Sequence, residues 1–124
     1  MTKEAMEYNK DSLLWKAGNQ EGKVSARTAF NAMRMGDQTA KAVVDKYIRY
    51  LACGITNTIN IFQPDILCIG GGVCNEGDPL LVPMKEIVAR ENYTRNSPKN
   101  AEIVIAKLGN DAGIIGAAFL GNAK

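Results

Sequence analysis

The 124-residue sequence contains no histidine, and this absence excludes several kinds of chemistry. Without an imidazole there is no histidine general base, no serine or cysteine triad that depends on one, and no histidine-ligated zinc. No two acidic residues have a spacing that indicates a metal site either. We therefore expect no metal ligands in this chain.

The sequence also lacks a large excess of positive or negative charge, and it lacks long apolar runs. The 15 Lys and Arg residues oppose 13 Asp and Glu residues, and the formal net charge of +2 argues against nucleic acid as a partner. No apolar run approaches the roughly 18 residues of a membrane span. No leader-like segment opens the chain. We therefore expect a cytoplasmic protein without a membrane partner.

The 3 cysteines form no Cys-x-x-Cys pair, which argues against a redox or zinc motif. Cys53, Cys68 and Cys74 each lie in or beside an apolar run. Such positions favour reduced thiols packed in a core, in a reducing compartment.

The first half of the chain has the periodicity of helices. We expect a polar segment over 1–24, with one short helix around 13–15 that ends near Gly18 and a surface connection over 18–23. Ser25 can cap a helix over 26–35, and Asp37 can cap a long helix over 38–62. Gly54 lies in the middle of that long helix, so we expect a close contact with a neighbouring element there. Pro64 ends it.

The second half, by contrast, alternates between strands and helices. Apolar runs at 66–69 and 101–106 predict two strands that are buried on both faces, as parallel strands are. Between them, Asp78 as a cap and Pro79 in the first turn predict a helix to about residue 92. Small residues in a last helix over 112–120 permit close packing. The fold class is therefore α/β, helix-rich, with a small parallel βαβ unit.

Two parallel strands are too few for a self-sufficient sheet in water. If both strands are buried, they must pair with residues that this chain does not contain. We therefore expect the chain to be the C-terminal part of a longer protein, with residues 25–124 forming part of a larger lobe. The missing lobe, or a second copy of the chain, would be its partner.

Three consecutive glycines, Gly70, Gly71 and Gly72, follow the first strand. Glycines here let a ligand approach the backbone closely, and ligands of open α/β sheets bind at the carboxyl ends of strands. A tight turn without a ligand explains the triplet equally well. The spacing fits neither a Walker A loop nor the Gly-x-Gly-x-x-Gly fingerprint.

The carboxylates near the strand ends have structural explanations that we favour. Asp111 precedes an apolar helix and reads as its cap rather than as a catalytic group, and Asp65 reads as a turn residue. Glu76 and Asp78 follow the glycines and could contact hydroxyl groups of a ligand.

Four blocks of this sequence resemble the ROK family of bacterial repressors, open reading frames and sugar kinases. They are FQPDILCIGGGV at 62–73, LACGITN at 51–57, MGD at 35–37 and LGNDAGIIGAA at 108–118. The resemblance covers nearly the whole chain, weakly before Ser25, and is strongest to the glucokinases of Gram-positive bacteria.

The resemblance implies a two-lobed kinase of the actin and hexokinase superfamily, with a ribonuclease-H-like core in each lobe. The parent enzyme would use ATP and magnesium to phosphorylate glucose at its 6-hydroxyl. In that superfamily the glycine turn lies against the adenosine and α-phosphate. The implied nucleotide-binding residues are Gly70, Gly71, Gly72, Val73, Asn75 and Glu76.

Several parts of the family pattern are missing from this sequence. It lacks the Asp-x-Gly-x-Thr phosphate loop, the catalytic aspartate within Asn-Asp-x-Asn, the cysteine-rich zinc loop, and the His and Glu residues that bind the sugar. Asn110 and Asp111 look like part of the catalytic run but stand before the last helix. We therefore expect no catalytic residue, no zinc site and no turnover in the isolated chain.

Two other functions remain open. The chain could be the sugar-sensing half of a ROK transcriptional repressor, or a stand-alone oligomerisation module.

Overall fold

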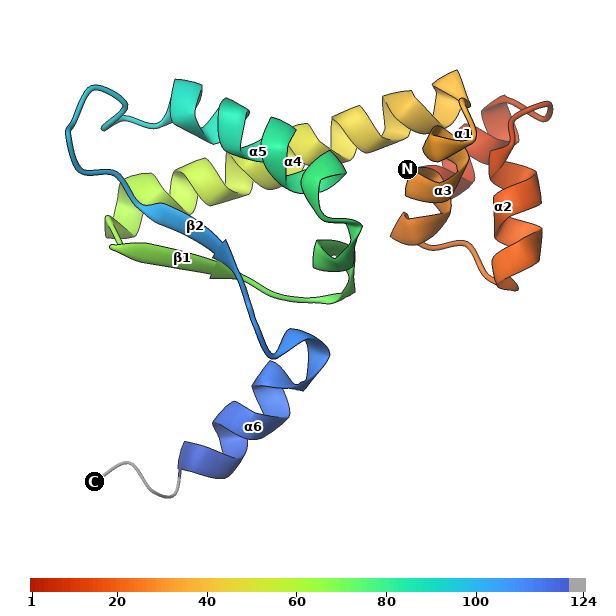
Figure 1. The fold of residues 1–124 in the computed structure, drawn as a ribbon. Coiled ribbons are helices and arrows are strands. Elements are labelled where there is room, and N and C mark those ends of the chain that lie inside the picture. The colour runs from red at the N-terminus through yellow and green to blue at the C-terminus, as the bar shows by residue number, and fades with distance from the viewer. Residues whose placement is uncertain (121–124) are drawn as a thin grey trace. The chain divides into compact units, whose positions relative to one another are not determined.

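The computed structural model describes residues 1–120, without the side chain of Asn110. The elements follow in the order α1 (Thr2–Tyr8), α2 (Leu14–Glu21), α3 (Ala26–Arg34), α4 (Gln38–Phe62), β1 (Ile66–Ile69), η1 (Gly72–Glu76), α5 (Asp78–Glu91), β2 (Glu102–Ile105), η2 (Gly109–Asp111) and α6 (Ala112–Phe119). Figure 1 shows them as a ribbon. The chain divides into two compact units, Met1–Cys53 and a second that begins at Gly54. The expected division at residues 24 and 25 is a different one and stays a prediction.

The first unit is helical and has its own apolar core. Helices α1, α2 and α3 pack together, and α4 begins in this unit. The buried apolar residues of the unit are Met6, Leu14, Ala17, Ala29, Phe30, Ala32, Ala40, Val44, Ile48 and Ala52. Those of α4 recur at intervals of four residues, which is the apolar stripe that the sequence indicated.

The expected single helix before residue 24 is wrong, because two helices form there. Helix α2 continues through Gly18 to Glu21, so no surface connection begins at residue 18. Gly18 is buried, and a Cβ atom there would lie 3.3 Å from Cγ2 of Val24. The glycine therefore permits close packing inside the helix and does not end it. Gly22 ends it instead, with φ of 68°.

Asp37 caps α4, as the sequence predicted. Its Oδ1 accepts a hydrogen bond of 2.7 Å from the amide of Ala40. Its Oδ2 accepts bonds of 2.8 Å from the Ser12 hydroxyl and 2.6 Å from the Leu13 amide. Partial burial opposes ionisation, but these hydrogen bonds outweigh it and hold the pKa of Asp37 below its usual range. One carboxylate thus joins the start of α4 to the segment before α2.

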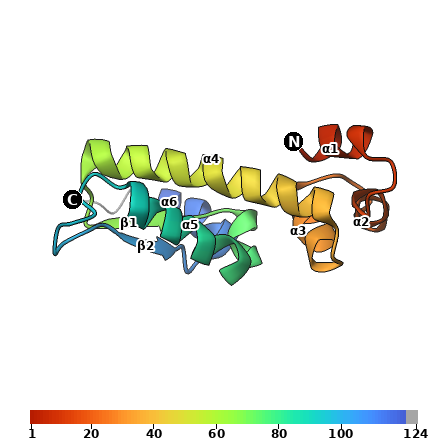
Figure 2. The same ribbon diagram turned by 90° about the horizontal axis from the view of Figure 1, so that it is seen from above.

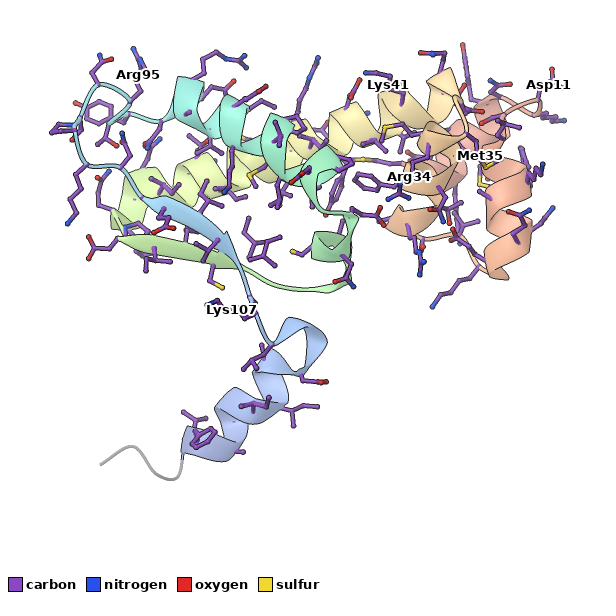
Figure 3. All side chains as sticks on the ribbon, viewed as in Figure 1. Asp11, Arg34, Met35, Lys41, Arg95 and Lys107 are labelled. Carbon is purple, nitrogen blue, oxygen red and sulfur yellow. The ribbon has the colours of Figure 1, made fainter. Side chains whose placement is uncertain are left out.

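Replacing Asp37 with alanine is expected to lower the free energy of unfolding by about 1–2 kcal/mol at pH 7, because it removes a cap and leaves the Ser12 hydroxyl without its acceptor. Urea unfolding of both proteins measures the difference. Because the folded pKa is depressed, this stabilisation is present above the unfolded pKa of about 3.9 and is lost as the pH falls through the folded value. The difference between the proteins should therefore shrink at pH 3. Asp11→Ala, at an exposed carboxylate (Figure 3), is the control and should change stability by less than about 0.5 kcal/mol.

Strands β1 and β2 pair in parallel, and α5 makes the crossover between them. The register aligns Ile66 with Glu102 and Ile69 with Ile105, which confirms the βαβ unit. Helix α5 lies over one face of this sheet in Figures 1 and 2. The buried apolar residues of this second unit are Ile55, Ile59, Cys74, Leu80, Met84, Val88 and Ile103.

The expected burial of the strands on both faces is wrong for this chain. Leu67, Ile69, Ile103 and Ile105 lie on one face and are buried or half-buried. On the other, Ile66 is 59% exposed, Cys68 is exposed, and Val104 is half-buried. We call Ile66, Cys68 and Val104 the outer sheet face. The strands have the composition of buried ones, but nothing in residues 1–120 covers this face.

Two further packing expectations fail in the same way. Gly54 is exposed, and a Cβ atom there would meet no described atom within 4 Å, so the expected close contact is wrong. Helix α6 buries none of its residues, and Ile114 is 74% exposed. Its Gly113 and Gly116 also meet no described neighbour within 4 Å. The apolar helix therefore buries no side chain, and neither glycine is packed closely against a described residue.

Candidate functional site

The candidate site is the turn that leaves the carboxyl end of β1. Gly70 follows the strand, Gly71 makes the turn, and Gly72 begins η1. Gly71 has φ of 101° and ψ of 165°, a conformation that only glycine adopts without strain. Gly77 has φ of 69° and closes the segment before α5. Glycines are therefore required at both ends of η1 by the backbone itself.

The backbone amides at this turn are open to a ligand. The amides of Gly71 and Gly72 donate to no acceptor among the described residues, whereas the Gly71 carbonyl accepts a bond of 3.1 Å from Cys74. A Cβ atom added at Gly71 or Gly72 would meet nothing within 4 Å. Free amide donors at an open turn are a suitable binding surface for anionic oxygens. The turn is tight, with a bond from Cys74 to Gly71, and it also leaves space in front of its amides for a ligand.

The other predicted site residues lie in η1. Val73 is half-buried, Asn75 is exposed and Glu76 is half-buried. Cys74, between them, is buried, and burial raises the pKa of its thiol. The side chain of Cys74 is buried within the second unit, to which η1 belongs, while Asn75 is exposed to solvent. Helix η1 therefore has a buried residue, Cys74, next to an exposed polar residue, Asn75, and both lie close in sequence to the open amides of Gly71 and Gly72.

A second short helix, η2, follows β2 at the same edge of the sheet and lies against η1. The sequence assigned Asp111 to capping the last helix through its side chain. It does occupy the N-cap position of α6, but its carboxylate accepts no capping hydrogen bond and is exposed, so the capping bond is wrong. The side chain of Asn110 lies outside the described residues.

The start of α5 also differs in detail from the prediction. Gly77 occupies the N-cap position, and Asp78 is the first helical residue, so Asp78 is not the cap. The Gly77 carbonyl accepts bonds of 3.0 Å from the amides of Leu80 and Leu81. Asp78 still stabilises the helix because a carboxylate in the first turn interacts favourably with the helix dipole. Pro79 lies in the first turn as predicted.

Asp65 lies at the other end of β1 from the glycine turn. Its Oδ1 is 2.7 Å from Nζ of Lys99, and this ion pair lowers the pKa of Asp65. The pair is exposed, so solvent screens it. Asp65 therefore belongs to the turn before the strand, as predicted.

None of the three cysteines forms a disulfide within residues 1–120, and only Cys74 is buried. Cys53 and Cys68 are exposed, so the expectation of three packed thiols is wrong for two of them. Residues 1–120 contain no group of three or more acidic or cysteine side chains placed to hold a metal ion. No helix in that range is long and apolar enough to cross a membrane.

Comparisons with known proteins identify the family of this chain. A family model described as "ROK family" matches residues 6–124. The chain belongs to the ROK family. The resemblance that rested on four sequence blocks is thereby confirmed over almost the whole chain.

Several similar proteins are named as sugar kinases. The chain is 38% identical over 117 residues to a glucokinase of Halalkalibacterium halodurans, a match that covers 94% of this chain and 35% of that protein. It is 36% identical over 110 residues to a glucokinase of Thermotoga maritima, with 88% and 34% covered. An N-acetyl-D-glucosamine kinase of Pasteurella multocida is 32% identical over 97 residues, with 78% and 31% covered. The chain therefore spans about a third of the length of these relatives.

A solved structure shows the same fold. The crystal structure of a Cytophaga hutchinsonii protein, described as a sugar kinase, matches with a TM-score of 0.75 and covers 98% of this chain and 39% of that one. The sequence identity is 24%, so this likeness concerns the fold. It confirms a helix-rich α/β fold of the sugar-kinase type.

Sequence reasoning missed one feature of the second unit, a cavity of about 240 Å³ between α5 and the start of β2. Asn92 has polar neighbours in the sequence but is 4% exposed in the structure, and its burial depends on the return of β2. No local pattern signals such a site.

Proposed function

We propose that this chain is the nucleotide-facing, C-terminal part of an ATP-dependent sugar kinase of the glucokinase type. The complete enzyme would transfer the γ-phosphoryl group of ATP to the 6-hydroxyl of glucose, in the cytoplasm. The observation that carries the proposal is the glycine turn, with open amides at the carboxyl end of a parallel strand. The similarity to two glucokinases supports the reaction and the sugar.

In this proposal the turn binds the nucleotide through its backbone. The amides of Gly71 and Gly72 would donate to α-phosphate oxygens, and Gly70 would allow the adenosine to lie close to the strand. Val73, Asn75 and Glu76 would flank the nucleotide from η1. The described side chains do not gather around a cation, so magnesium would arrive with ATP and take its protein ligands from the rest of the enzyme. The zinc loop of the family is not in this sequence.

The partner of this chain would be the remaining two thirds of the kinase. That remainder would cover the outer sheet face and extend the sheet at the free edge of β1. It would also supply the catalytic carboxylate and the sugar ligands, which this sequence lacks. A second copy of the chain could cover the same apolar surface, but it would bring neither of these groups.

A kinase is favoured over the repressor because the three relatives described above are named as kinases. The exposed outer sheet face and α6 favour association with something, which suits the oligomerisation module as well. An oligomerisation function, however, does not explain the open amides at the glycine turn.

A nucleotide titration tests the proposed site in this chain. With ¹⁵N-labelled protein, ATP is expected to shift the amide resonances of Gly71 and Gly72 in a saturable way, because these donors gain phosphate acceptors. Amides of the first unit, such as that of Ala40, serve as the internal control and should not move. Shifts that spread over both units, or none at the turn, would contradict the assignment.

A further inference from the structure

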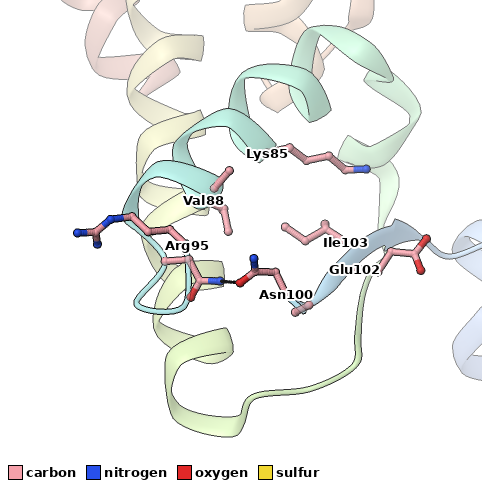
Figure 4. A pocket seen from close by; sticks show the side chains of 9 residues that line it. Lys85, Val88, Arg95, Asn100, Glu102 and Ile103 are labelled. Carbon is pink, nitrogen blue, oxygen red and sulfur yellow. Dashed lines mark hydrogen bonds between the residues drawn. The ribbon is translucent and has the colours of Figure 1, made fainter. Parts of the chain in front are cut away.

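The cavity between α5 and β2 lies at the opposite end of β2 from η2. One wall is a face of α5, where Lys85 and Val88 lie one turn apart, and it continues to Asn92 just past the end of the helix. The other wall is the start of β2, with Ile103 on the inner face of the sheet. Figure 4 shows these walls and the amides at one end of the cavity. Its volume of about 240 Å³ is somewhat below the range of about 300–1,000 Å³ typical of drug-sized ligands.

The floor of the cavity is apolar. Val88 is 3% exposed and Ile103 is 8% exposed, and Ala89 and Ala101 also line the space. An apolar floor with few polar groups is the usual composition of a small-molecule site. A ligand with a flat apolar body would fit against it.

The amide of Asn92 is the polar group that such a ligand would meet. Asn92 is 4% exposed, yet its hydrogen bonds are long. Its Nδ2 donates to Oδ1 of Asn100 at 3.4 Å, and its Oδ1 accepts from the amide of Thr94 at 3.5 Å. Asn100 already has a better donor in the Thr94 hydroxyl, at 2.7 Å. Asn92 is therefore a buried donor that would gain a stronger bond from an anionic oxygen.

Charge around the opening favours an anion. Lys85 and Arg95 line the cavity, and their charged ends are directed outward in Figure 4. Both side chains are long and exposed, so they can turn toward a bound carboxylate. Glu102 also borders the cavity, but it aligns with Ile66 on the outer sheet face, so its carboxylate points away. The local field is therefore positive where the ligand would enter.

We propose that this cavity binds a small aromatic or aliphatic monocarboxylate, separate from the glycine turn. The carboxylate accepts from Nδ2 of Asn92 and is attracted by Lys85 and Arg95, while the apolar body rests on Val88 and Ile103. The site gives the chain a second ligand, at the other end of β2 from the proposed nucleotide. It does not depend on the kinase assignment.

Benzoate is the probe. In an NMR titration of the ¹⁵N-labelled chain at constant ionic strength, benzoate should cause saturable shifts at Asn92, Asn100 and Ile103, with a dissociation constant on the order of 1 mM. Neutral benzamide should bind at least about tenfold more weakly, because it lacks the charge. Gly71 and Gly72 should not move, which distinguishes this site from the one for ATP.

Three variants complete the experiment. Asn92→Asp keeps the size of the side chain but places a second carboxylate at the ligand, and should abolish binding. The double change K85Q and R95Q should weaken binding by roughly fivefold while leaving the fold intact, since both residues are exposed. Lys107→Gln removes one positive charge beyond the other end of β2 (Figure 3) and should have no effect. Shifts that do not saturate, equal binding of benzamide, or indifference to K85Q and R95Q would overturn the proposal.

Discussion

Replacing Gly71 with valine is expected to weaken ATP binding by roughly tenfold or more, the largest effect of any single substitution in the chain. The valine side chain would occupy the open space in front of the turn, where the proposal places the nucleotide. It would also strain the backbone, because φ at Gly71 is 101°. The measurement is the dissociation constant for ATP, from the amide shifts of η1 as ATP is added.

Two further variants separate these two effects. Gly72→Val adds the same side chain one residue later, where φ is not in the left-handed region and a Cβ atom meets nothing within 4 Å. It should weaken ATP binding without lowering the free energy of unfolding. Gly36→Val is the converse control, because φ there is 90° and the residue lies in the first unit. It should lower stability and leave ATP affinity unchanged. If Gly72→Val bound ATP as well as the unchanged chain, the turn would not be the nucleotide site.

The isolated chain is expected to form no glucose 6-phosphate above background when it is given ATP, magnesium and glucose. Phosphoryl transfer needs a positioned sugar hydroxyl and a group that accepts its proton, and this sequence contains neither the sugar ligands nor the catalytic run of the family. Compared with a complete kinase, the isolated chain is therefore expected to lose all of the catalysed turnover. A coupled assay that detects glucose 6-phosphate makes the measurement.

The Thermotoga maritima glucokinase is a suitable positive control, since the chain is 36% identical to it over 110 residues. A negative control is the Gly71→Val chain, which removes the proposed nucleotide contact. Turnover by the unchanged chain that exceeds both the background and the Gly71→Val chain would show that this third of the relatives' length suffices for catalysis. It would refute the proposal that the catalytic carboxylate and the sugar ligands come from the rest of the kinase.

Local sequence signals predicted the elements whose formation depends on nearby residues. Asp37 was identified as a cap because an acidic residue preceded a long apolar stripe, and its bond to Ala40 confirms the reason. The strand at 66–69 was identified by its length and its flanking proline and glycines. Gly18 was misread because a glycine that ends a helix and a glycine that admits a neighbour look alike in sequence. The structure distinguishes them, because Val24, Met6 and Thr28 pack around Gly18.

Burial was harder to predict, because it depends on what lies next to an element. The composition of β1 indicates a strand covered on both faces, yet Ile66 is 59% exposed. The composition records an environment that residues 1–120 do not provide. For the site, the position of the glycine turn followed from the strand, whereas the open amides of Gly71 and Gly72 emerged only from the hydrogen bonds. The role of Asn92 was invisible for the same reason.

The uncovered outer sheet face has a consequence for the fate of the polypeptide in a cell. The outer sheet face is apolar, and it lies beside a strand edge with unpaired backbone groups. Chaperones bind such exposed surfaces, and proteases degrade chains that expose them. The steady-state amount of this polypeptide should then be higher when a complementary surface covers the outer sheet face sooner after synthesis. Association with the partner surface would therefore control the abundance of the chain as well as any reaction rate.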